Sequence, residues 1–348
     1  MVNFSAPKTK SMIFTRHRNT IHHPPLSFNN MQIDEVDNHK HLGLILSKDG
    51  SWSAQVNAMY SKANRALNIL RKMKRLLDRK TLYRLYCTQV RPLLEYADCV
   101  WININKEQAD KLESINLEAA RIITGAPRGT RHNLLYEESG LELLSERRRK
   151  HQLTLYFKIK KGLAPAYLSV RARVPPYQPH PHRLRNVDND DIMSTNTVSY
   201  KHSFFHSSIR EWNSLSPSVR DLNQSVQAFK NSLNRNRKKP PDHYLQIVVD
   251  RATQIIHANM RTQSSNLNYH LFERYLKDDS ACNCGAPVED ANHFFKQCPL
   301  YRDLRNEIFG IHVPSLNEIL CGSLNDNTEK NIQLFTKVQQ YIKRSERF

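Results

Sequence analysis

Residues 51–73 read SWSAQVNAMYSKANRALNILRKM, and the pattern in this stretch decides the fold class of the region around it. Apolar residues recur every three or four positions, which is the period of an amphipathic helix. The apolar stripe consists of Val56, Met59, Ala63, Ala66, Leu70 and Met73. Ser51 or Ser53 can serve as the N-cap. We therefore predict one helix of roughly two dozen residues here.

Three more helices follow along the chain. Asp78 can cap a second helix, which Pro92 kinks or ends because proline has no backbone N–H to donate. Asn105 can cap a third helix, and Gly125 stands at its C-terminal stop. Residues 145–161 have the apolar pattern of a fourth helix. The sequence thus predicts a helical domain over residues 51–171.

The regions on either side of this domain have a different texture. Residues 1–50 contain two short apolar runs, 11–15 and 40–46, which predict a small β element. Residues 172–200 are rich in proline and polar residues, which predicts a linker. Helical patterns return over 201–236 and again over 237–348, including a run at 243–276. The predicted fold class is mainly α with a small N-terminal β element.

Composition narrows the range of functions. The 348 residues include 52 Lys and Arg against 33 Asp and Glu, a net charge of +19 that favours a polyanionic partner such as RNA or DNA. With only nine glycines, no glycine-rich phosphate loop can be found, which excludes dinucleotide-binding and P-loop folds. No signal peptide or membrane span is recognisable. We expect an intracellular protein of the nucleus or cytoplasm, neither secreted nor bound to a membrane.

One cysteine and histidine cluster has the spacing of a metal site. Cys282, Cys284, His293 and Cys298 form the pattern C-x-C-x8-H-x4-C, and Gly285 allows a sharp turn behind the first pair. Thiolates and imidazole are the ligands that zinc prefers, and four of them close a structural site. The sequence therefore predicts a structural zinc knuckle over 282–298. The alternative is a set of reduced cysteines beside a surface histidine.

Two runs of basic residues predict contacts with phosphate groups. The first run contains Arg71, Lys72, Lys74, Arg75, Arg79, Lys80 and Arg84. The second contains Arg147, Arg148, Arg149, Lys150, Lys158, Lys160 and Lys161. The alternative for each run is an ordinary solvated helix face. Two runs in one helical region of a chain with net charge +19 favour nucleic-acid binding.

No catalytic residue is assigned. The segment Tyr96-Ala97-Asp98-Cys99 is similar to the Tyr-x-Asp-Asp hairpin of reverse transcriptases, but a cysteine replaces the second aspartate. Two-metal phosphoryl transfer needs several carboxylates grouped around the ions. The pairs Asp190-Asp191 and Asp278-Asp279 lie in polar stretches without flanking apolar strands.

Several motifs, taken in order, resemble the end of the palm and the thumb of jockey-like non-LTR retrotransposon reverse transcriptases, which are RNA-directed DNA polymerases. They are residues 8–14 (KTKSMIF), 40–43 (KHLG), Ser51-Trp52, 90–96 (VRPLLEY) with Trp101, 146–149 (ERRR), 184–186 (LRN), 212–215 (WNSL) with Phe229, and the Cys/His cluster. The resemblance spans about residues 2 to 305.

The resemblance implies roles for particular positions. Lys8 and Thr9 match the start of the late palm strand, and Lys8 is a predicted nucleic-acid contact. Leu42 and Gly43 match the turn region that supports the primer end, where His41 departs from the usual aromatic residue. The helices over 53–124 would form the thumb, which holds the primer and template duplex. Cys282, Cys284, His293 and Cys298 match the family's knuckle. Zinc is the implied cofactor, and magnesium is expected only if a complete palm is supplied elsewhere.

The resemblance also implies what this polypeptide does not contain. In the family order, the palm motifs with the metal-binding aspartates precede the Lys-Thr strand, which here begins at residue 8. We therefore expect a truncated, element-derived chain that binds RNA or DNA but cannot polymerise by itself. Two alternatives stay open: a host zinc-binding module that binds an acidic protein, and an enzyme that acts in trans or as a nuclease.

Overall fold

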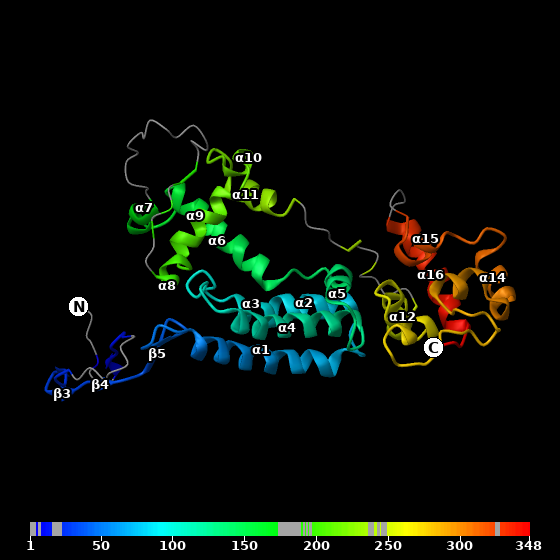
Figure 1. Cartoon of the computed structure of the whole chain (residues 1–348), viewed down its shortest axis with the longest axis horizontal. Helices are drawn as coiled ribbons and strands as arrows, with labels where there is room; N and C mark the ends of the chain where they lie inside the picture. Colours follow the sequence, from blue (N-terminus) through cyan, green and yellow to red (C-terminus); the bar gives the residue numbers. More distant parts are fainter. Residues whose placement is uncertain are drawn as a thin grey trace. The chain divides into compact units, whose positions relative to one another are not determined.

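The computed structural model describes residues 5, 8–15, 23–172, 189–190, 192, 194, 197–235, 240–241, 244, 249–323 and 328–348. The chain forms two compact units, each made of three segments. The first unit consists of Met1–Ala63, Leu93–Glu113 and Leu144–Asn236, and the second of Asn64–Pro92, Ser114–Leu143 and Arg237–Phe348. Helices dominate both units, which confirms the predicted fold class (Figure 1). No helix among the described residues is long and apolar enough to cross a membrane.

The N-terminal β element consists of three small two-stranded pairings. Strand β1 (Lys10–Ser11) pairs in parallel with β4 (Asp34–Glu35), and β2 (Ser27–Phe28) pairs antiparallel with β3 (Met31–Gln32). Strands β5 (Asn38–His41) and β6 (Leu44–Ser47) form a hairpin. The predicted small β element is therefore present, and the apolar run 40–46 contains the hairpin turn. Leu42 and Gly43 both have positive φ, as a two-residue hairpin turn requires.

Helix α1 (Ser53–Met73) confirms the first predicted helix almost residue for residue. Val56, Met59, Ala63 and Leu70 are buried as expected. The stripe was wrong only at its end, because Met73 is 39% exposed in the last turn. The apolar period therefore identifies the buried face of the helix but not the residue at which burial ends.

The second predicted helix is one continuous helical stretch with a local change of register. Helix α2 (Arg79–Leu85) begins at the predicted cap, since the Asp78 side chain accepts a hydrogen bond from the Thr81 backbone N–H at 2.8 Å. A π-helical turn, η2 (Tyr86–Val90), then leads into α3 (Arg91–Glu95). Pro92 lies just beyond this turn and cannot donate a backbone hydrogen bond, which accounts for the change of register.

Helix α4 (Lys106–Thr124) has the predicted cap and stop. The Asn105 side chain accepts from the Gln108 backbone N–H at 2.8 Å, and the Gln108 side chain accepts from the Asn105 N–H at 3.1 Å. Gly125 has φ +78°, and a Cβ there would collide with Ile255. The short helix α5 (His132–Ser139), which the sequence pattern did not predict, ends at Gly140.

The core of the first unit forms around α6 (Leu144–Lys160), the fourth predicted helix. Trp212 and Phe229 pack against its buried face, and the Phe157 and Phe229 rings stack with their centroids 4.4 Å apart. Trp101 and Trp212 are both buried and belong to the hydrophobic core. The neighbouring helices are α7 (Ala166–Ala172), α8 (Val198–Lys201), α9 (Phe204–Asn213), α10 (Pro217–Arg220) and α11 (Val226–Leu233).

The core of the second unit lies among helices near the C-terminus. They are α12 (Arg251–Arg261), α13 (Asn268–Phe272), η4 (His293–Gln297), η5 (Pro299–Tyr301), α14 (Arg302–Phe309), α15 (Leu316–Cys321) and α16 (Thr328–Arg344). The single helical run predicted at 243–276 was wrong, since it is interrupted between α12 and α13. Most of the predicted linker at 172–200 lies outside the described residues, and the domain boundaries stay predictions.

Candidate metal centre and basic surfaces

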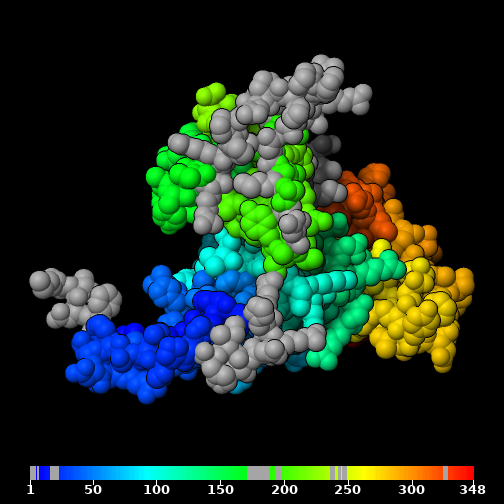
Figure 2. All heavy atoms as spheres, turned by 60° about the vertical axis from the view of Figure 1, so that its left-hand side comes forward, coloured from blue at the N-terminus to red at the C-terminus, as the bar shows by residue number. Residues whose placement is uncertain are grey.

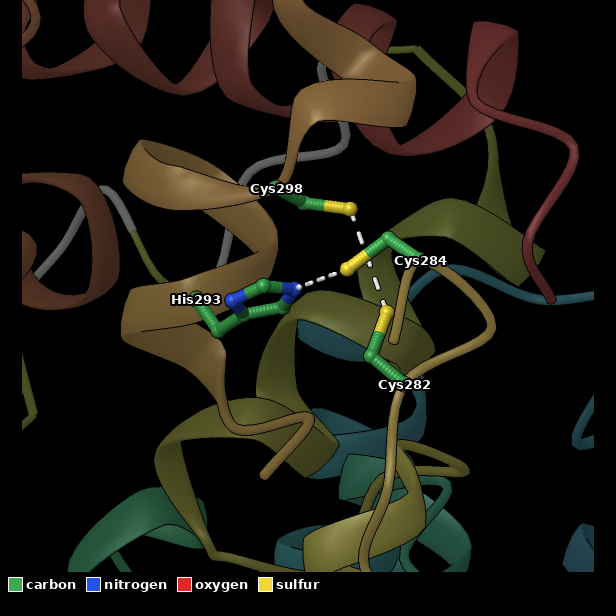
Figure 3. Close-up of side chains that lie close together, drawn as sticks. All are labelled: Cys282, Cys284, His293 and Cys298. Atoms are coloured by element: carbon green, nitrogen blue, oxygen red, sulfur yellow. Dashed lines mark hydrogen bonds between the residues drawn. The ribbon is translucent and has the colours of Figure 1, made fainter. Parts of the chain in front are cut away.

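The structure brings the four predicted ligands together. One ligand atom from each of Cys282, Cys284, His293 and Cys298 lies within 4.8 Å of the others (Figure 3). The sulfur atoms of Cys282 and Cys298 are 3.9 Å apart, and the Cys284 sulfur lies 3.3 Å from His293 Nε2. A tetrahedral site with bonds of about 2.0–2.3 Å holds its ligand atoms about 3.3–3.8 Å apart. The spacing therefore suits a metal ion of the size of zinc.

A tight turn presents the first two cysteines. The Cys282 backbone N–H donates to the Ala286 carbonyl, and the Gly285 N–H donates to the Cys282 carbonyl, both at 2.9 Å. Gly285 has φ +91°, which residues with a Cβ rarely adopt. This turn explains how two ligands can be separated by a single residue.

The other two ligands lie at the two ends of one helical turn. His293 begins η4, where its backbone N–H donates to the Asp290 carboxylate at 2.7 Å. Cys298 follows the same turn, and its N–H donates to the His293 carbonyl at 2.7 Å. The aspartate was not among the predicted site residues. Its position three residues before the histidine is the signal that could have identified it as a cap.

Burial makes the site costly to leave without a cation. Cys282, His293 and Cys298 are buried and Cys284 is half-buried. Burial raises the pKa of the Cys282 thiol to about 12, whereas the Ala286 backbone N–H lowers the pKa of Cys284. A bound cation stabilises buried thiolates and lowers their pKa values. Three thiolates and one imidazole leave a four-coordinate ion no open position, so the arrangement suits a structural role rather than catalysis.

The aromatic core of the second unit supports the ligand-bearing turn. Phe294 and Phe295, which directly follow the ligand His293, are fully buried, and the Tyr341 hydroxyl donates to the Phe294 carbonyl at 2.8 Å. The Arg305 guanidinium donates to the Cys298 carbonyl at 3.1 Å. These contacts fix the backbone at both ligands of this turn.

The first basic run is mostly exposed. Arg71 pairs with Glu118 at 3.1 Å. The others that lie on the surface make no ion pair with any described residue: Lys72, Lys74, Arg75, Lys80 and Arg84. Lys8, the predicted contact at the N-terminus, is exposed as well. These six positions are accessible to a ligand, and their role in binding stays a prediction.

Arg79 does not belong to this surface, and its expected exposure was wrong. Its side chain is 1% exposed and pairs with the buried carboxylate of Glu138 at 2.6 Å. Arg261 binds the same carboxylate at 2.7 Å and stacks on Tyr244 with its guanidinium carbon 4.1 Å from the ring centroid. Arg79 is therefore a structural residue that joins α2 to α5 and, through Glu138, to α12.

The second basic run is largely occupied by contacts within the first unit. Arg147 pairs with Glu95, and Arg149 pairs with Glu211 at 2.5 Å. Arg148 is buried, with its guanidinium carbon 5.7 Å from the centre of the Trp101 ring. Acidic and aromatic neighbours thus already hold these three arginines, and their predicted contact with nucleic acid stays a prediction.

Two of the acidic residues considered for catalysis, Asp98 and Asp190, have structural partners. Asp98 is buried and lies 2.5 Å from His151. Asp190 pairs with Lys160 at 2.5 Å and accepts a hydrogen bond from the Tyr156 hydroxyl at 2.7 Å. In the described part of the chain, the Cys/His cluster is the one group of three or more metal-binding side chains that lie close together.

Comparisons with known proteins give two short matches. The chain is 43% identical over 67 residues to the "115 kDa protein in type-1 retrotransposable element R1DM" of Drosophila melanogaster, a match that covers 19% of this chain. It is 44% identical over 45 residues to the "Retrovirus-related Pol polyprotein from type-1 retrotransposable element R1" of Bradysia coprophila, over 13% of this chain. The matches cover 6% and 4% of the relatives' own lengths.

These matches support an origin in a non-LTR retrotransposon. No family model matches the chain. No solved structure matches it either.

Proposed function

We propose that this chain is a nucleic-acid-binding part of a non-LTR retrotransposon reverse transcriptase of the jockey-like type. The observation that carries the proposal is the Cys282, Cys284, His293 and Cys298 cluster. Such a cluster is a plausible zinc knuckle in a chain of net charge +19 that is similar to R1 element proteins. Zinc knuckles are among the small modules that contact single-stranded RNA.

The proposed metal is zinc, and its role is structural. Metal analysis of the purified chain should give about one zinc per molecule. Cys282→Ser with Cys284→Ser should abolish zinc binding and unfold the turn around it, because binding energy in such a site is folding energy. Cys87→Ser is the matched control, since Cys87 does not belong to the cluster and lies far from it in the sequence. Zinc retained by the double variant would refute the assignment.

The proposed ligand is RNA or DNA, bound chiefly through phosphate contacts. Support comes from the exposed cations of the first basic run, of which Lys74 and Arg75 are examples. Fluorescence anisotropy with labelled RNA and DNA should give an affinity that falls linearly with salt on logarithmic axes. A zinc-loaded protein that binds neither nucleic acid at low salt would overturn the proposal.

By itself, the chain is proposed to bind nucleic acid without extending a primer. Asp98 and Asp190, two of the acidic residues considered for catalysis, are engaged by His151 and Lys160. Magnesium would matter only where a complete palm is supplied by another polypeptide. Primer extension with a template, nucleotides and Mg²⁺ should give no product, and extension by the purified chain would contradict this part of the proposal.

A further inference from the structure

The second unit contains two cavities that share Arg128 in their walls. The smaller has a volume of about 370 Å³ and lies beside the C-terminal ends of α1 and α4. The larger, of about 660 Å³, is bounded by residues 128–131, by the end of α12 and α13, and by residues 290–292 just before the ligand His293. Figures 1 and 2 both place the α5 region next to the segment that begins with α12.

The smaller cavity is strongly cationic. Its charged lining residues are Arg71, Lys74, Arg75, Arg121, Arg128 and a single carboxylate, Glu118. Glu118 is already shared between Arg71 at 3.1 Å and Arg121 at 3.4 Å. Lys74, Arg75 and Arg128 make no ion pair within the described residues. Several positive charges thus surround one hollow without enough acid to neutralise them.

These cations are not needed to complete the local fold. Two carbonyls at the end of α4 are satisfied by Arg251, whose guanidinium donates to the Ile123 carbonyl at 2.7 Å and to the Ile122 carbonyl at 3.4 Å. The Arg121 Nε atom is buried and has no hydrogen-bond partner. A buried donor without a partner is costly, and an anion in the cavity is a natural partner for the guanidinium groups.

The larger cavity is polar and less positive than the smaller one. Its charged lining residues are two carboxylates, Glu273 and Asp290, and four arginines, Arg128, Arg131, Arg261 and Arg274. Arg261 already pairs with Glu138 at 2.7 Å. Arg274 is used structurally, since it donates to the Arg128 carbonyl at 3.2 Å. The Tyr269 side chain is 37% exposed at the wall of the cavity and offers an aromatic face. This mixed lining suits a neutral, planar group with hydrogen-bonding edges better than a phosphate.

The histidine in the wall contributes as a neutral group. His270 is buried, and its Nδ1 lies 2.7 Å from the Ser265 hydroxyl. Burial lowers the pKa of His270 to about 4, so the imidazole carries no charge at neutral pH. His270 therefore adds no positive charge to the larger cavity at neutral pH.

We propose that the two cavities together bind one unpaired nucleotide of an RNA or DNA strand. Its phosphate lies against Lys74, Arg75 and Arg128, and its base enters the larger cavity beside Tyr269. This inference rests on the proposed nucleic-acid binding and specifies where and in which form the strand binds. Hollows of this volume hold molecules of small-ligand size, whereas a duplex is too wide to enter. A cationic track next to an aromatic side chain is the usual arrangement for single strands.

The test compares a single-stranded 20-nucleotide RNA with its duplex, at several KCl concentrations, by fluorescence anisotropy. The variant combines Lys74→Gln, Arg75→Gln and Arg128→Gln, which removes charge at exposed positions. Single-strand affinity should fall at least about tenfold, and the logarithmic salt slope should fall by about 0.7, since the three cations neutralise one phosphate. Tyr269→Ala should weaken single-strand binding by roughly 5- to 150-fold without changing the salt slope.

The matched control removes the same charge elsewhere in the second unit. It combines Arg65→Gln, Arg302→Gln and Lys337→Gln, three exposed cations outside both cavities. The control should bind within about twofold of the unmodified protein. Equal losses in both triple variants, or equal losses for strand and duplex, would overturn the site while leaving nucleic-acid binding intact. If the unmodified protein binds no nucleic acid, the proposed function itself fails.

Discussion

The two basic runs have similar compositions but differ in how many of their side chains are exposed and without a partner. Each contains seven cations, over residues 71–84 and 147–161. In the first run, five cations are exposed and their side chains have no partner among the described residues. In the second run, only the Lys158 side chain has no partner there. The difference lies in the helices. Helix α6 packs into the core of the first unit, where α9 and the end of α3 supply Glu211 and Glu95, whereas the first run crosses the surface end of α1 into α2.

The number of basic residues in a run of sequence therefore does not give the number of cations that a ligand can reach. A cation next to a buried helix face meets partners from other segments, and those partners are separated from it by about 50 to 60 residues in the cases of Arg147 and Arg149. Such pairings cannot be found from the run itself. Substitutions in the two runs should therefore differ in their effects on stability and on nucleic-acid affinity.

The largest expected effect comes from Arg79, the exception within the exposed run. Glu138→Ala leaves Arg79 and Arg261 buried without their shared carboxylate, which should destabilise the second unit by about 3–5 kcal/mol. Arg79→Met leaves Glu138 paired with Arg261 and should cost less, about 1–3 kcal/mol. The neighbouring substitution Lys80→Ala changes an exposed side chain and should stay within about 0.5 kcal/mol. Urea unfolding followed by circular dichroism measures both. Equal stability of the Arg79 and Lys80 variants would show that burial does not separate these neighbours.

The free energy of unfolding at low pH should depend on the same buried carboxylate, Glu138. Burial alone would raise the pKa of Glu138, but Arg261 and Arg79 outweigh it and lower the pKa from 4.5 to about 2. A lowered folded pKa gives stability that is present above pH 4.5 and is lost as the pH falls toward 2. The loss should be about 3 kcal/mol. Between pH 4.5 and pH 2, the free energy of unfolding of Glu138→Gln should fall by about 3 kcal/mol less than that of the unmodified protein. Urea unfolding midpoints measured across this pH range test the difference.

Nucleic-acid binding gives the direct comparison of the two runs. Lys74→Gln with Arg75→Gln should lower single-strand affinity about tenfold, or about 1.4 kcal/mol, and reduce the logarithmic salt slope by up to about 0.7. Arg147→Gln with Arg149→Gln removes the same charge but from side chains that Glu95 and Glu211 hold. The second pair of substitutions should leave the salt slope unchanged. A larger loss from the second pair would reverse the assignment of the two surfaces.

Local signals in the sequence predicted much of the fold and the metal centre. The caps Asp78 and Asn105, the stop at Gly125 and the ligand spacing around Gly285 are all read within a few residues, and the structure has each of them. What could not be predicted depends on contacts between distant segments. The Arg79 and Glu138 pair joins residues 59 positions apart, and the cavity at Arg128 needs α4, α12 and a loop to be placed together.

The smallest expected effect is the difference in coupling energy between the two arginine–glutamate pairs of the second run. Arg149 and Glu211 are each about one-third exposed, with side-chain exposures of 35% and 32%, whereas the Arg147 and Glu95 side chains are 18% and 13% exposed. Water screens the more exposed pair, so a double-mutant cycle with glutamine should give it a coupling of about 0.2–1 kcal/mol. The more buried pair should exceed that value, because its charges are less solvated and more costly to leave unpaired. Coupling energies of equal size would mean that solvent exposure does not grade these contacts, and that the second run is held by packing of α6 rather than by its acids.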